Sequence, residues 1–136
     1  MKKRLLLLLP ALIILFPNLT LYAQKPLLLS NVRKIYIEKM DDNLDQYLGS
    51  SISKKFHGSV AVVLNKNEAD AILRGVNIGA QTTKEATVQL VDPAGSQVLW
   101  SGTGGDRKVL TLGIAHGGQE KIADRLIGEL KKAMER

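Results

Sequence analysis

The sequence contains no cysteine among its 136 residues. Disulfide bonds, thiol catalysis and cysteine-ligated zinc sites are therefore excluded. Histidine is nearly as rare, because His57 and His116 are the only two, and two imidazoles cannot complete a zinc site unaided. A domain without disulfide bonds or zinc must rely on its hydrophobic core for stability, and this chain is long enough for a modest core.

The first 23 residues have the pattern of a secretory signal peptide. Positive charges at positions 2–4 precede an apolar run over residues 5–16, and Ala23 offers a small residue just before a cleavage point. The alternative is an uncleaved membrane anchor, because residues 5–23 approach the roughly 20 apolar residues that span a bilayer. We expect cleavage near Ala23 and a periplasmic or secreted product.

Removal of this segment changes what the net charge implies. Three positive charges leave with residues 1–23, so the formal net charge falls from +6 to +3. Such a small excess on an exported protein gives no reason to expect nucleic acid as a partner. The expected organisation is a signal peptide over residues 1–23, a leader over 24–31 and a single domain over 32–136.

The first half of that domain has the pattern of a strand, a helix and a second strand. Residues 34–38 alternate between apolar and polar, which is typical of a strand. Asp41 and Asp42 are expected to cap a helix that ends before Gly58. An apolar stripe runs along that helix at Leu44, Leu48, Ile52 and Phe56. Residues 59–64 are apolar and rich in valine, which predicts a central strand buried on both faces.

The second half predicts an antiparallel meander followed by a helix. A polar turn at residues 65–70 leads into three strands, expected at 71–78, 87–91 and 97–101. The turn Asp92-Pro93-Ala94-Gly95 suits a hairpin, because proline presets φ and glycine tolerates positive φ. Residues 119–136 form an amphipathic helix with an inner stripe at Ile122, Leu126, Leu130, Ala133 and Met134.

These elements predict an α+β fold with the order β-α-β-β-β-β-α. The sheet is expected to be mixed and four- to five-stranded, with both main helices on one face. The opposite face would then be open, with Thr87, Gln89 and Gln97 among its residues. Trp100 is expected to share a face with Val98 and to pack in the core.

Candidate catalytic motifs do not meet their spacing requirements. The glycine-rich stretch 102–108 lacks the Lys-Ser/Thr ending of a phosphate-binding loop, and the third glycine of a dinucleotide fingerprint is absent. It is expected to be a flexible connection, with a partner- or ligand-binding loop as the alternative. The carboxylates Asp41, Asp42 and Asp45 are explained by helix capping, and no nucleophile elbow is present. No enzyme, metal or cofactor is therefore predicted.

Two short motifs resemble a group of bacterial envelope domains. Residues 67–75, with Ala69, Asp70, Leu73 and Gly75, match the step "x-A-D-x-x-L-x-G" into a strand. Residues 88–92 with Gly95 and 98–101 match the hairpin "v-x-l-v-d-x-x-G-x-v-l-w-s". Together they resemble the small α/β domain of the TolB amino-terminal, CsgG, LpoB and LptE-like proteins. Many of these are lipoproteins, whereas this chain lacks the cysteine that would carry a lipid.

The resemblance implies a fold and a role in envelope assembly through protein contacts, and no catalysis. We therefore expect a non-enzymatic binding or assembly module with an envelope protein as partner. The alternative is a carrier of envelope lipid or glycan that uses the basic positions of the last helix and the glycine-rich loop. An enzyme that uses Asp106, Arg107 and His116 is a third interpretation. Candidate binding residues are Gly104, Asp106, Arg107, His116 and Arg125.

Overall fold

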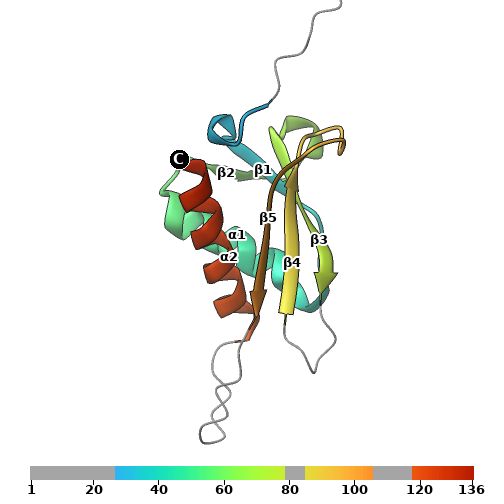
Figure 1. The fold of residues 1–136 in the computed structure, drawn as a ribbon, viewed down its shortest axis with the longest axis vertical. Coiled ribbons are helices and arrows are strands. Elements are labelled where there is room, and N and C mark those ends of the chain that lie inside the picture. The colour runs from blue at the N-terminus through green and yellow to red at the C-terminus, as the bar shows by residue number, and fades with distance from the viewer. Residues whose placement is uncertain (1–26, 79–84, 106–117) are drawn as a thin grey trace, which may run out of the picture.

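The computed structural model describes residues 27–78, 85–105 and 118–136. They form an α+β fold in which two α-helices lie side by side against one face of a five-stranded mixed sheet (Figure 1). The helices and strands are β1 (Lys34–Ile37), α1 (Leu44–Phe56), β2 (Ala61–Val63), β3 (Ala71–Ile78), β4 (Glu85–Val91), β5 (Val98–Gly105) and α2 (Gln119–Met134). Three short 3-10 turns accompany them, η1 (Leu29–Asn31), η2 (Asp41–Asn43) and η3 (Lys66–Glu68). The predicted fold class and element order are confirmed.

The strands follow the order β2-β1-β3-β4-β5, with β1 parallel to both β2 and β3. β3, β4 and β5 form the predicted antiparallel meander. The prediction of a central second strand is wrong, because β2 is a three-residue edge strand. β3 occupies the other side of β1, so the valine-rich run is left at the border of the sheet. Ala61 is exposed, and Leu64 directly after the strand is 94% exposed.

Asp70 joins the starts of β1 and β3. Its Oδ2 accepts hydrogen bonds from the backbone N–H groups of Arg33 and Lys34, both at 2.9 Å. The N–H of Asp70 in turn donates to the carbonyl of Lys34, also at 2.9 Å. The aspartate of the step motif therefore holds two parallel strands in register, since an ionised acceptor strengthens each hydrogen bond.

The start of α1 differs from the prediction. Asp41 and Asp42 form the η2 turn and do not cap the helix, whose preceding residue is Asn43. Asp42 and Asn43 both have positive φ, 55° and 57°, which turns the chain sharply between β1 and α1. Asp45, within the first helical turn, accepts a hydrogen bond from the N–H of Met40 at 3.3 Å.

The core lies between the sheet and the two helices. α1 buries its predicted stripe, and α2 buries Ile122, Leu126, Leu130 and Met134 together with Ala123 and Ile127, which the predicted stripe omitted. Ser51 is 2% exposed and its hydroxyl donates to the carboxylate of Asp124, which links the helices. An exposed ion pair between Lys54 and Glu120 at 3.6 Å lies along the same helix contact.

β5 extends through the glycine-rich stretch to Gly105, so the expectation of a flexible connection is wrong for residues 102–105. A Cβ at Gly102 would lie 2.4 Å from Cη2 of Trp100, and a Cβ at Gly104 would lie 3.1 Å from Cγ of Leu126. These glycines allow the indole and α2 to approach the strand closely. Their role in β5 is therefore packing.

A bulge beside Val91 changes the face of Trp100. Val91 pairs with Val98 and Leu90 pairs with Trp100, so one extra residue, Leu99, lies in β5. The expectation that Trp100 shares a face with Val98 is wrong, because the extra residue reverses the alternation between them. Trp100 packs against the core, as predicted.

The part of the predicted leader that the structure describes contacts the core. Leu27 and Leu29 are partly buried and pack against it, and η1 lies next to α2. Among the described residues, no helix has both the length and the apolar character needed to cross a membrane.

Candidate interaction surface

The face of the sheet opposite the two α-helices carries a row of apolar side chains that crosses all five strands. We call this side of the sheet the open face. In register order, the row consists of Val63, Tyr36, Ile72, Val91 and Val98. Its centre is buried, since Ile72 and Val91 are each 2% exposed, while Val98 at the β5 end is 48% exposed.

Polar side chains occupy the neighbouring rows of the open face. Arg74 donates from Nη2 to Oε1 of Gln89 at 3.2 Å across β3 and β4. The hydroxyls of Thr87 and Thr103 lie 2.8 Å apart across β4 and β5. Thr87 and Gln89 alternate with buried residues of β4, which confirms their predicted place on this face. An apolar row beside an arginine and uncharged hydrogen-bonding groups is a composition that suits protein contact.

The open face is continued by the hairpin between β4 and β5. Oδ1 of Asp92 accepts from the N–H of Gln97 and Oδ2 accepts from the hydroxyl of Ser96, each at 2.8 Å. These hydrogen bonds, led by the one from Gln97, lower the pKa of Asp92 below its usual 3.8. Gly95 has φ +71°, which glycine adopts without strain. Gln97 lies in this turn, outside the strands.

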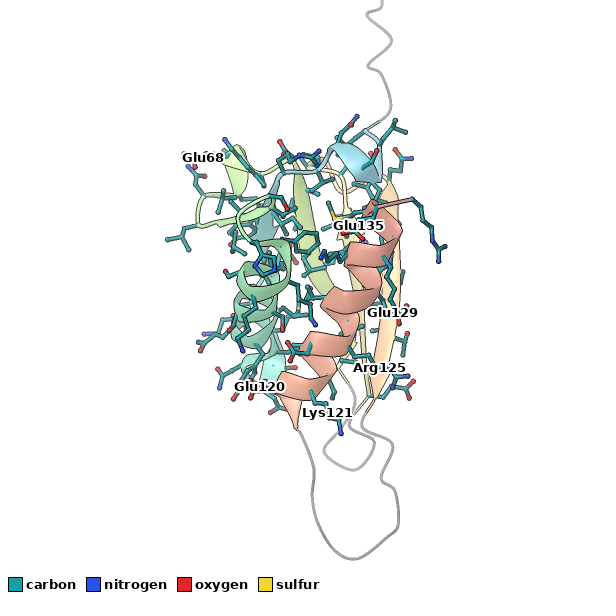
Figure 2. The ribbon with its side chains drawn as sticks, turned by 90° about the vertical axis from the view of Figure 1, so that its left-hand side faces the viewer. Glu68, Glu120, Lys121, Arg125, Glu129 and Glu135 are labelled. Atoms are coloured by element: carbon teal, nitrogen blue, oxygen red, sulfur yellow. The ribbon has the colours of Figure 1, made fainter. Side chains whose placement is uncertain are left out.

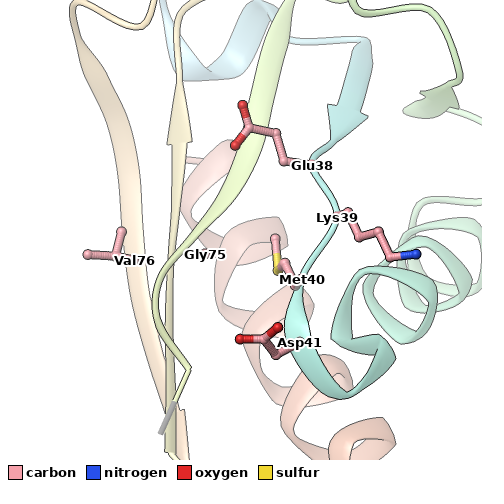
Figure 3. A pocket seen from close by; sticks show the side chains of 6 residues that line it. All are labelled: Glu38, Lys39, Met40, Asp41, Gly75 and Val76. Carbon is pink, nitrogen blue, oxygen red and sulfur yellow. The ribbon is translucent and has the colours of Figure 1, made fainter.

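A small pocket lies at the carboxyl end of β1, where β3 bulges (Figure 3). Its volume is about 260 Å³. The residues that line it are Glu38, Lys39, Met40, Asp41, Gly75 and Val76. Glu38 is also paired with Lys66 at 3.4 Å. Within the described ranges, no group of three histidine, cysteine or acidic residues could hold a metal ion.

The solvent side of α2 carries both signs of charge. Figure 2 shows Lys121 and Arg125 along the same helix as Glu120, Glu129 and Glu135. Lys131 pairs with Glu135 at 3.5 Å. The basic positions of this helix therefore do not form a surface of one sign.

Of the five sequence-based candidates, the structure describes Gly104 and Arg125. Gly104 is buried in β5 beneath α2, whereas Arg125 is exposed on α2. Asp106, Arg107 and His116 lie outside the described residues. His57 directly follows the last residue of α1, has φ 48° and is exposed.

Sequence reasoning missed the contribution of β1 to the open face. Tyr36 alternates with Ile35 and Ile37, both of which face the core. That alternation was the available signal, because a residue between two inward-facing neighbours must point to the opposite face. The position of Ile72 and Val91 in the same row depends on strand register, which no local pattern reveals.

The known structures that are similar to this chain are distant from it in sequence. No family model and no curated protein sequence matches the chain. Two structures of the PelC dodecamer from Paraburkholderia phytofirmans, one of them a single-substitution variant, are similar to it at 17% identity, with TM-scores of 0.48 and 0.47. Each match covers 80% of this chain, and 91% and 93% of the PelC chains respectively. Similarity at this level says nothing about what this chain binds.

Proposed function

We propose that this protein is an exported, non-enzymatic binding module of the cell envelope that contacts a protein partner through its open face. The signal-like first 23 residues support export to the periplasm or beyond. The apolar row across five strands supports a protein contact, and it is the observation that carries the proposal.

The exposure of this row favours a partner that covers the β5 end. Val98 is 48% exposed, and the half-buried Tyr36 lies further along the same row. The buried centre at Ile72 and Val91 gives the surface a rigid base, which reduces the ordering cost of binding. Hydrogen-bonding groups at Gln89 and Thr87 would supply specificity at the border.

The proposal is tested by affinity capture from envelope fractions with protein expressed from the full-length sequence. Val98→Asp places a charge in the apolar row and should abolish capture of a discrete partner, because a buried unpaired charge opposes association. Gln46→Asp adds the same charge on the exposed side of α1 and should leave capture unchanged. Equal capture by both variants would contradict the proposal.

Vesicle flotation distinguishes the carrier alternative. A lipid or glycan carrier that uses the basic positions of α2 would bind anionic vesicles less well after Lys121→Glu and would be insensitive to Val98→Asp. Our proposal predicts instead that Val98→Asp lowers partner capture and that Lys121→Glu leaves partner capture unchanged.

A further inference from the structure

β5 is an unusually unprotected edge of the sheet. Proteins commonly guard such edges with short strands, charged residues, proline or bulges. The opposite edge, β2, has only three residues. β5 has eight residues, with neither charge nor proline among them, and no strand in the described ranges pairs with its outer side. A bulge disturbs only its start, so the strand is regular from Trp100 onward.

The backbone groups that point away from the sheet can be assigned. The N–H of Asp92 donates across the hairpin toward the β5 side. Backbone directions alternate along a strand, so every second residue of β4 back from Asp92 also points to β5. The β5 partners of those residues are Trp100 and Gly102, which use their groups within the sheet. The N–H and C=O groups of Ser101 and Thr103 therefore point outward.

We propose that β5 pairs with β5 of a second copy of this chain, antiparallel about a two-fold axis at Gly102. In this register Ser101 of each copy faces Thr103 of the other, and each such pair exchanges both of its N–H···O=C hydrogen bonds. Trp100 and Gly104 of the two copies then lie opposite each other on the helix side of the sheet, and the pairing buries no charged residue of either strand.

The charges on α2 are placed so that the same two-fold axis brings opposite charges together. A Cβ added at Gly102 would lie 3.3 Å from Cδ2 of Leu126, so the turn of α2 that carries Leu126 is level with the centre of β5. Arg125 and Glu129 are exposed on the side of α2 away from α1, toward the β5 border (Figure 2). The two-fold axis makes the α2 helices antiparallel, so Arg125 of each copy faces Glu129 of the other. Unlike charges therefore meet twice, which argues for a second copy as the occupant.

The pairing is independent of the proposed partner surface. It lengthens the sheet sideways and leaves both open faces accessible, so a dimer without a captured partner, or a captured partner without a dimer, separates the two proposals.

A charge exchange tests the register. Sedimentation velocity on protein expressed from the full-length sequence should show a reversible dimer. Glu129→Arg should raise its dissociation constant at least about tenfold, because like charges then face each other twice. Adding Arg125→Glu to that variant should restore dimerisation. Lys131→Glu, on another side of α2, is the control and should leave the dissociation constant unchanged.

A backbone variant tests the strand pairing itself. Thr103→Pro removes an outward N–H without removing a hydrogen bond to β4, and it should give a folded monomer. Thr103→Val removes the same hydroxyl but keeps the N–H, and it should remain dimeric. A wild-type protein that is monomeric at all concentrations, or a dimer that persists in a folded Thr103→Pro variant, would overturn the proposal.

Discussion

Replacement of Gly102 by alanine should destabilise the protein through a single steric conflict. The added Cβ would lie 2.4 Å from Cη2 and 2.5 Å from Cζ2 of Trp100. Carbon atoms in contact are about 3.5–4.0 Å apart, so the indole must move by about 1 Å or leave its position. Gly102 has no positive φ, so the backbone itself can accept alanine.

The expected loss is about 2 kcal/mol in the free energy of unfolding. Overpacking of this kind costs about 1–3 kcal/mol when the neighbours must shift. At Gly104 the added Cβ would lie 3.1 Å from Cγ of Leu126, a conflict that a few tenths of an ångström relieve. Gly104→Ala should therefore cost at most about 1 kcal/mol, partly offset by the reduced flexibility of the unfolded chain.

Urea denaturation followed by the fluorescence of Trp100, the only tryptophan, measures both the stability and the environment of the ring. Gly102→Ala should shift the native emission to longer wavelength. Gly128→Ala is the control and should not lower the stability. Nothing lies within 4 Å of its added Cβ, and alanine favours the helix by about 1 kcal/mol. In a Trp100→Leu background, followed by far-UV circular dichroism because the fluorophore is gone, Gly102→Ala should cost less. A neutral Gly102→Ala variant with unshifted emission would refute this account of β5.

Three further changes test the remaining contacts. Asp70→Ala should cost about 1–3 kcal/mol in chemical denaturation, because the N–H groups at the start of β1 lose an ionised acceptor. Asp92→Asn should flatten the loss of stability in acid. The folded pKa of Asp92 is lowered, so its contribution is present above pH 3.8 and is lost as the pH falls through that lowered value. Ser51→Val should cost about 1–3 kcal/mol, because it leaves Asp124 without its hydroxyl donor between the helices.

Each of these has a distinct contrary result. An Asp70→Ala variant as stable as the wild type would show that the hydrogen bonds of Asp70 to the start of β1 do not stabilise the protein. If the free energies of unfolding of wild type and Asp92→Asn fall in parallel between pH 5 and pH 2, the Asp92 carboxylate does not contribute to the loss of stability in acid. Equal thermal midpoints for wild type and Ser51→Val would show that the hydroxyl between the helices does not stabilise the protein.

The fold could be predicted from local pattern where one face of an element is buried. The helix stripes and the alternation in residues 34–38 each carry such a signal, and the hairpin turn carries its own chemistry. The position of β2 could not be predicted, because an apolar run such as 59–64 has no periodicity that distinguishes a centre from an edge. Its edge position follows from β3, which pairs with the other side of β1.

In the candidate site, too, local pattern predicts some residue positions, whereas contacts between distant segments decide others. Thr87 and Gln89 were placed on the open face by simple alternation in β4. The face of Trp100 was predicted wrongly because one bulge residue, Leu99, reverses the count, and bulges leave no mark in a short apolar run. The glycines of β5 suggested a loop, whereas contacts with distant α2 decide their role.

We propose that the protein meets its partner at the open face. A photo-crosslinking residue introduced in cells at Gln89, in the middle of that face, tests it directly, with the same residue at Gln46 on the exposed side of α1 as reference. We predict a discrete adduct with a second, different protein from position 89 and none from position 46. Adducts from position 46 alone, or from neither position in cells that produce the folded protein, would contradict the account.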